Sequence, residues 1–184
     1  MSLPDNIMQF LAQCNTCDFG MKKAVEYNTL QEVWDDCCRA DWMLQMLAAT
    51  LDPADNAARC AFLVCATQCV RAVVKDDYEG NMIANLVELW ACGKEECLGA
   101  SKTNTQSVRE ELKELAGDVD RHRIPAAYAL TTLVLEDAEH WPKAAAICSC
   151  LPKNADDVEK TIMQEACSYI VRNHYPAAPE LPKT

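Results

Sequence analysis

Apolar residues recur at helical spacing across residues 29–51, and a capping box marks where this segment begins. Thr29 stands three residues before Glu32, the arrangement in which two side chains satisfy each other's backbone N–H groups at a helix N-terminus. At 3.6 residues per turn one face carries Leu30, Val33, Trp34, Cys37, Leu44, Leu47, Ala48 and Leu51. The pattern predicts one long core helix over residues 29–51.

Similar patterns predict helices along the rest of the chain. Asp52, with Pro53 at the first helical position, predicts a second core helix that ends near Lys75 and forms an antiparallel hairpin with the first. Pro125 and Pro142 begin two further helices in the same way. The remaining predicted helices cover residues 5–13, 21–27, 82–91, 107–119 and 154–175. In the last of them the inward face is predicted to carry Val158, Ile162, Ala166, Tyr169 and Ile170.

Local signals set the other boundaries. Residues 76–81 are typical of a turn, and the polar residues 101–105 predict a linker inside the domain. Ser107 and Glu110 form a second capping box, and Asn154 is the predicted cap of the last helix. Each signal involves residues within four positions of one another.

Composition favours a single all-α domain. The chain has 184 residues, of which half are apolar and only five are glycine, and β-branched residues are sparse. This length buries a core without disulfides or metal. We expect one multi-helix bundle of about seven to nine helices over residues 1–175, followed by an extended, loosely held, proline-rich tail over residues 176–184.

The chain is acidic, with 28 Asp and Glu against 17 Lys and Arg and a net charge of −11. Such a charge repels nucleic-acid phosphate and suits a partner protein with a basic surface. The candidate partner surface comprises Asp35, Asp36, Asp76, Asp77, Glu79, Glu110, Glu111 and Glu114, with a further acidic run at residues 156–159. The alternative is that these residues are solvated helix faces that serve solubility.

Twelve cysteines raise the question of disulfides or metal. Residues 1–25 lack the basic start and apolar segment of a signal peptide, which predicts reduced thiols and a cytoplasmic location. No apolar run approaches the roughly 20 residues that span a membrane. Cys14 and Cys17 have zinc-knuckle spacing, but Cys37 and Cys38 would point about 100° apart on a helix. We expect no metal and no cofactor.

Charged residues inside the predicted 29–51 helix form a candidate buried polar site. Asp41 falls on the apolar face of that helix, where an isolated carboxylate is costly, so it needs a partner. Arg71, with Gln68 nearby, is the predicted partner, while Arg39 is placed to pair with Asp35 at the surface. The pair is either structural, fixing the register of two helices, or the centre of a ligand or enzyme site.

Catalytic signatures are absent from the sequence. It contains no glycine-rich phosphate loop, no His-Glu-x-x-His pair and no nucleophile elbow. His122, His140 and His174 all fall near predicted helix ends, where dipole interactions or aromatic packing account for them. We therefore expect a protein that is not an enzyme.

Residues 34–44, W-D-D-C-C-R-A-D-W-M-L, and residues 61–71, A-F-L-V-C-A-T-Q-C-V-R, resemble an uncharacterised helical family of bacteria and their phages. That family is more distantly similar to predicted toxin-immunity proteins. The resemblance covers about residues 24–100, and departs from the family at residues 80–83, Gly-Asn-Met-Ile, where relatives often have Arg-Pro-Arg. It implies an acidic, immunity-like or phage or bacterial accessory protein that binds another protein; the alternative is a structural or oligomer-forming protein.

Overall fold

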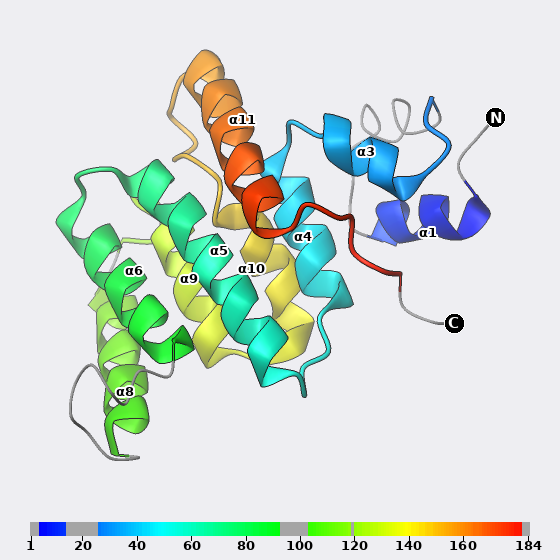
Figure 1. Ribbon diagram of the computed structural model, residues 1–184. Helices are drawn as coiled ribbons and strands as arrows, with labels where there is room; N and C mark the ends of the chain where they lie inside the picture. The colour runs from blue at the N-terminus through cyan, green and yellow to red at the C-terminus, as the bar shows by residue number, and fades with distance from the viewer. Residues whose placement is uncertain (1–3, 14–25, 93–102, 119, 182–184) are drawn as a thin grey trace.

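Helices account for nearly all of the regular structure in the computed structural model, which describes residues 4–13, 26–92, 103–118 and 120–181. Within these ranges there is no strand, so the predicted all-α class is confirmed (Figure 1). The elements in chain order are α1 (Asp5–Gln13), α3 (Leu30–Asp36), α4 (Ala40–Thr50), α5 (Asn56–Val74), α6 (Tyr78–Ala91), α8 (Thr103–Asp118), α9 (Pro125–Leu135), the 3-10 turn η1 (Ala138–His140), α10 (Trp141–Ile147) and α11 (Asp157–His174).

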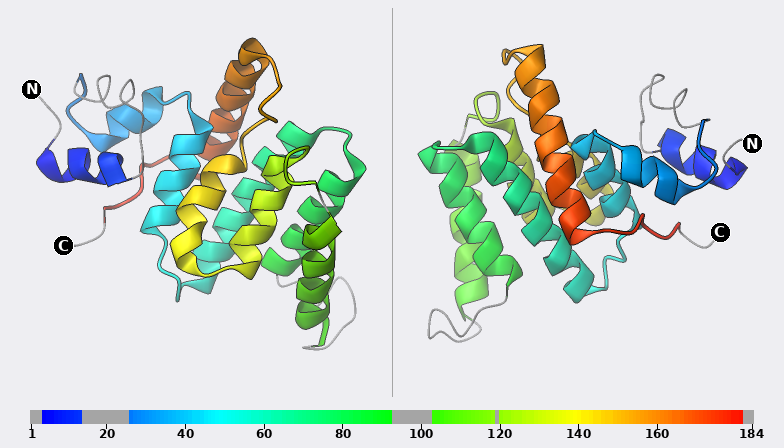
Figure 2. Two further views of the ribbon diagram at one scale, coloured as in Figure 1. Left: turned by 180° about the vertical axis from the view of Figure 1, so that it is seen from behind. Right: turned by 45° about the horizontal axis from the view of Figure 1, so that its top comes forward.

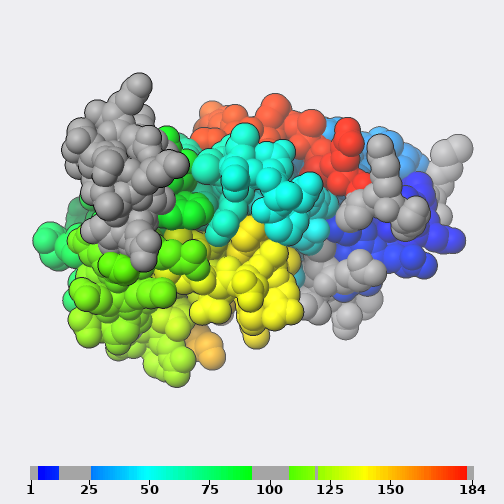
Figure 3. Space-filling view, turned by 90° about the horizontal axis from the view of Figure 1, so that it is seen from below, coloured from blue at the N-terminus to red at the C-terminus, as the bar shows by residue number. Residues whose placement is uncertain are grey.

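Helices α4, α5, α9 and α10 lie at the centre of the bundle. Helix α4 packs chiefly against α10 and α5 chiefly against α6, while α11 lies across α5 and α4. Figure 3 shows, from below, the α4–α5 connection beside the connection between α9 and α10. The predicted hairpin of the first two core helices is therefore wrong in its packing, since α4 makes only minor contact with α5.

The predicted helix over residues 29–51 is broken into α3 and α4. The capping box at its start is present: the Thr29 hydroxyl accepts from the Glu32 N–H at 3.1 Å, and the Glu32 carboxylate accepts from the Thr29 N–H at 3.2 Å. At the break, Cys37 is extended, with φ −69° and ψ 116°. The expectation of one continuous helix is therefore wrong.

Helix α11 supplies the groups that replace the missing helical hydrogen bond at this break. In a continuous helix the Asp41 N–H would donate to the Cys37 carbonyl. Instead the Asp41 N–H donates to Oε1 of Gln164 at 2.9 Å, and the Cys37 carbonyl accepts from Arg172 at 2.5 Å. Both backbone groups are satisfied, so the break leaves no orphaned donor or acceptor at that position.

Aspartates set two helix starts that differ from the predictions. Helix α5 begins at Asn56, because Asp55 accepts from the Ala58 N–H at 2.9 Å. Asp52 was the predicted cap, but its carboxylate accepts from the Ala54 N–H in the preceding turn. Helix α11 likewise begins after Asp156 and not after Asn154. An aspartate nearer the apolar stripe replaces the predicted cap in both cases.

Two other helices begin earlier than their patterns predict. Helix α6 starts at Tyr78 inside the predicted turn 76–81, since Asp77 accepts from the Gly80 N–H at 2.9 Å. Helix α8 starts at Thr103, so the predicted capping box at residues 107–110 lies within a helix. The predicted linker at residues 101–105 is helical from residue 103, and residues 101–102 lie outside the described residues.

The C-terminal tail is held against α3, contrary to the expectation that it is loose. Trp34, which is fully buried, donates from its indole N–H to the Tyr175 carbonyl at 2.9 Å. The amide of Gln31 donates to the Pro176 carbonyl at 3.2 Å and accepts from the Ala178 N–H at 2.9 Å. Figure 1 shows the tail running from α11 towards α1 and α3. These contacts explain how residues 175–178 are ordered without secondary structure.

An arginine that the sequence reasoning did not single out lies among aromatic side chains of neighbouring helices. The Arg59 guanidinium lies 4.9 Å from the Trp90 ring centre and 4.5 Å from that of Trp141, and donates to the Leu133 carbonyl at 3.1 Å. Burial lowers the pKa of Arg59. The arrangement joins α5, α6, α9 and α10 through one side chain.

The apolar character of α5 accounts for a membrane-like signal. Among the described residues, α5 is the helix that is long and apolar enough to cross a membrane by length and composition. It buries Phe62, Cys65, Cys69, Val70 and Val73 in the bundle, against α6, α9 and α11. The core helix of a bundle has the same composition.

Candidate functional site

The predicted polar site contains an ion pair, but with a different partner. Arg39 donates from Nε to Oδ1 of Asp41 at 2.9 Å and from Nη2 to Oδ2 at 2.5 Å. Its guanidinium also lies 4.8 Å from the ring centre of Trp42. The side chain of Asp41 is 15% exposed and that of Arg39 is 43% exposed. The pair is a two-pronged bridge at the start of α4, where a carboxylate also favours the helix dipole.

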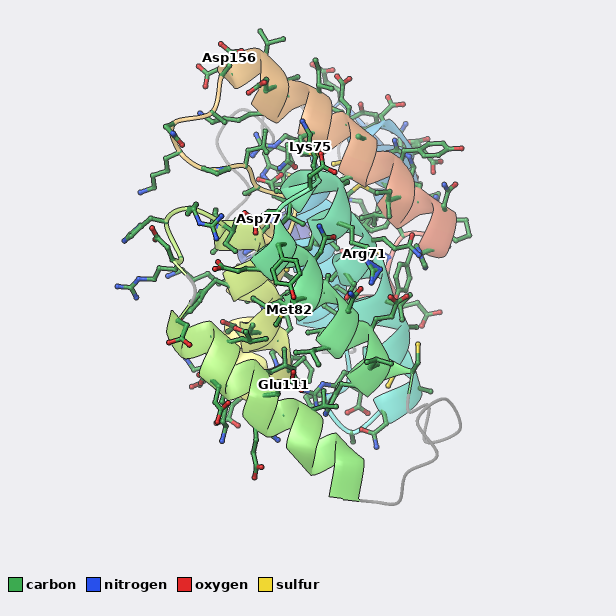
Figure 4. All side chains as sticks on the ribbon, turned by 90° about the vertical axis from the view of Figure 1, so that its left-hand side faces the viewer. Arg71, Lys75, Asp77, Met82, Glu111 and Asp156 are labelled. Atoms are coloured by element: carbon green, nitrogen blue, oxygen red, sulfur yellow. The ribbon has the colours of Figure 1, made fainter. Side chains whose placement is uncertain are left out.

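The predicted pair of Asp41 with Arg71 is wrong. Arg71 donates to Asn85 and to Glu88, both at 2.7 Å, and so ties α5 to α6. Figure 4 labels Arg71 in the view of the molecule from the side of α6. Gln68, the other proposed member, is exposed and bonds to His174 at 3.0 Å. Arg71 and Gln68 therefore face α6 and α11, and neither reaches α4.

Gln164 of α11 is a member of the polar site that the sequence reasoning missed. Its Oε1 accepts from the Asp41 N–H, and its Nε2 donates to the Ser149 carbonyl at 2.9 Å. One amide thereby joins the start of α4, the turn after α10 and the second turn of α11. No sequence signal marked Gln164, because only the structure shows that the adjacent Met163 faces the core.

A cleft of about 1220 Å³ opens beside this polar site. Four segments surround it: residues 38–41, residues 120–125, residues 147–154 and the first turns of α11. Apolar surface comes from Pro125, Ile147, Leu151 and Pro152. Basic and acidic side chains in the lining are Arg39, Asp41, Asp120, Arg121, His122, Arg123, Lys153, Asp157 and Lys160.

Every carboxylate of this cleft has a partner within the protein. Asp41 binds Arg39, and Asp157 accepts from Lys160 at 3.1 Å. Asp120 accepts from the backbone N–H of His122 at 2.8 Å, the main cause of the lowered pKa of Asp120. The lining cations are therefore not all neutralised by lining acids.

The predicted acidic partner surface is distributed over several elements. Arg123 binds both Asp77 and Glu79, connecting the α8–α9 turn to the start of α6. Asp36 accepts from the Tyr27 hydroxyl at 2.9 Å, and Asp35 accepts from Gln31 at 2.7 Å. The remaining members are exposed: Asp76, Glu110, Glu111 and Glu114. Figure 4 shows Asp156, Asp77 and Glu111 at separate levels of the molecule.

The outer face of α11 carries an apolar stripe whose residues were predicted to face inward; that prediction is wrong, because α11 buries Met163, Cys167 and Val171 instead. Val158 is 66% exposed, Ile162 is 59% exposed and Tyr169 is 65% exposed. These positions fall within one side of the helix at 100° per residue; Glu165 lies on the same side between Ile162 and Tyr169, and Glu159 lies about 60° to one side. Figure 2 shows α11 on the outside of the bundle, with its first turns extending beyond the other helices.

Most cysteines in the described part of the chain are buried or half-buried, and Cys38 and Cys92 are exposed. All nine described cysteines are free thiols, and four of them are fully buried: Cys65, Cys69, Cys148 and Cys167. Burial raises the pKa of Cys148, and hydrogen bonding with Cys167 raises that of Cys69. No group of three or more His, Cys, Asp or Glu among the described residues is arranged to hold a metal ion. Cys14 and Cys17 lie outside the described residues.

Comparisons of the chain with family models, with curated proteins and with solved structures find no match. The resemblance of residues 34–44 and 61–71 to a bacterial and phage family stays a prediction. Two surface features of the molecule are suited to binding, namely the exposed stripe of α11 and the cleft beside the Arg39–Asp41 pair.

Proposed function

We propose that this protein is a non-enzymatic interaction factor that binds a basic segment of another protein, as an immunity-like or phage or bacterial accessory protein would. The observation that carries the proposal is the exposed apolar stripe of Val158, Ile162 and Tyr169 on α11. The occupant proposed for this stripe is an amphipathic helix whose apolar side is bordered by Lys and Arg.

Exposing the apolar stripe to water is unfavourable in free energy for the unbound protein. Helix α11 already buries Met163, Cys167 and Val171 on its inner face, so the exposed positions are additional apolar surface. Covering a large apolar side chain gains roughly 1.5–3 kcal/mol, and single exposed side chains are common on any protein. Three of them on one side of one helix form a surface suited to a partner helix.

Charge complementarity selects a basic partner. Glu159 lies beside the stripe, Glu165 lies within it between Ile162 and Tyr169, and Asp156 and Asp157 lie at its N-terminal end. Carboxylates at the rim of an apolar contact speed the approach of a cationic partner and disfavour an acidic one. The net charge of −11 acts in the same direction at longer range.

Affinity capture from extracts of the native host, with the wild-type chain and matched tyrosine variants, tests this proposal. Tyr169→Ser combined with Ile162→Asp should abolish capture of a basic protein. Tyr78→Ser should not, although Tyr78 is 78% exposed, because it lies on α6. The captured protein, once purified, should bind the wild-type chain directly, and Glu159→Lys with Glu165→Lys should weaken that binding at least tenfold at low salt.

Self-association is the outcome that would refute the proposal in favour of an oligomer-forming role. Analytical ultracentrifugation distinguishes the two. A wild-type dimer that becomes a monomer on Ile162→Asp and Tyr169→Ser would show that a second copy of this chain covers the stripe. Capture that is unchanged by the α11 variants would refute the docking surface itself.

A further inference from the structure

The cleft beside α4 carries unpaired positive charge in an acidic protein. Five Lys and Arg residues line it against three Asp residues, and Asp77 and Glu79 bind the lining Arg123. Arg39 and Lys160 are paired with lining acids, so the unpaired charge comes from two cations, whose potential a concave surface concentrates. The cleft therefore differs in chemistry from the α11 stripe.

Two cations of the cleft have no partner among the described residues. The side chains of Arg121 and Lys153 are exposed and form no hydrogen bond or ion pair there, although the lining carboxylates are all engaged. They come from the α8–α9 turn and from the α10–α11 connection, two of the segments that surround the cleft. An anion bound in the cleft would supply the charge partner that these cations lack.

Helix ends add to this potential. Helices α4 and α9 both begin at the cleft, where Arg39 and Pro125 belong to its lining. Neither helix has a side-chain hydrogen bond from its N-cap residue. At α4 the Asp41 carboxylate already occupies the first turn, so the partial positive charge that reinforces the cationic side chains comes from α9; the short α10, which ends at the cleft, opposes it only weakly.

We infer that this cleft binds a small organic phosphate. Arg121 and Lys153 bind the phosphate, and the organic part packs on Ile147, Leu151 and Pro152. The volume of about 1220 Å³ accommodates a molecule of nucleotide size. A nucleic-acid strand is disfavoured, because a strand that left the cleft past Arg123 would meet Asp77 and Glu79, which bind that arginine.

Isothermal titration of the full chain with ATP, phenyl phosphate and inorganic phosphate tests this inference. The test variant is Arg121→Ala with Lys153→Ala. The control is Lys113→Ala with Lys143→Ala, which removes two exposed cations that do not line the cleft. Circular dichroism and thermal unfolding of both variants establish that each is folded.

Saturable binding of ATP and phenyl phosphate is expected, with both organic phosphates tighter than inorganic phosphate. The test variant should raise their Kd at least tenfold, while the control changes it less than twofold. The inference is overturned if no probe binds saturably, if both variants weaken binding equally, or if inorganic phosphate binds as tightly as phenyl phosphate. Tighter binding of a single-stranded oligonucleotide than of ATP would also overturn it. None of these results depends on the α11 surface.

Discussion

A double-mutant cycle on Arg39 and Asp41 tests how the start of α4 is stabilised. Asp41→Ala removes a two-pronged bridge, with contacts of 2.9 and 2.5 Å, and a favourable charge in the first turn of a helix. Because Arg39 is 43% exposed, solvent screens the pair, and we expect a coupling free energy of about 1 kcal/mol. The loss of the helix-dipole interaction brings the whole cost of Asp41→Ala to about 1–2 kcal/mol.

Urea unfolding followed by circular dichroism at low salt measures the four proteins of this cycle, namely wild type, Arg39→Ala, Asp41→Ala and the double variant. A second cycle pairs Asp41→Ala with Arg71→Ala. Its coupling should lie within about 0.3–0.5 kcal/mol of zero, because Arg71 binds Glu88 and Asn85 and the two sites share no partner.

The opposite pattern would refute this account of the site. If Asp41 were paired with Arg71 inside the core, breaking the pair would cost about 3–5 kcal/mol, and the second cycle would show the large coupling. A coupling near zero between Arg39 and Asp41 would show that their contact contributes nothing in solution.

Three further outcomes follow from the structure. Trp34→Phe should cost more than the about 1 kcal/mol of the lost indole hydrogen bond to the tail, because the smaller ring leaves a cavity at a fully buried site, and limited proteolysis should cut the tail faster than in Trp42→Phe. Native-state alkylation read by mass spectrometry should modify the exposed Cys38 and Cys92 before the fully buried Cys65, Cys69, Cys148 and Cys167. Burial raises the pKa of Cys37 from 9.0 to about 11, so only the unfolded chain ionises this thiol between those values. The contribution of this thiol to the free energy of unfolding should be complete below pH 9, and urea unfolding should show a fall of at least about 1 kcal/mol by pH 11. A free energy of unfolding that does not change over this range would contradict the burial of the thiol.

The sequence by itself determined the all-α class and those features that depend on neighbours in the chain. The capping box of Thr29 and Glu32, the helix at residues 5–13 and the start of α9 at Pro125 are all where the pattern places them. A cap joins groups within about four residues, so the local sequence contains all the partners. Where two aspartates competed, as at Asp52 and Asp55, that information was not sufficient.

Only the tertiary structure decided the break between α3 and α4, because the groups that permit it belong to α11. Gln164 accepts a hydrogen bond from the Asp41 N–H, and Arg172 donates one to the Cys37 carbonyl. Both residues lie more than a hundred positions further along the chain than the groups they bind. The same reason separates Asp41 from Arg71, since helix packing placed α10 against α4 and α6 against α5. The cleft also has no sequence signature, because four segments that are distant in sequence form its walls. Hydrogen-bonding and charged groups take whichever partners the packed helices bring within reach, and periodicity along one helix does not specify them.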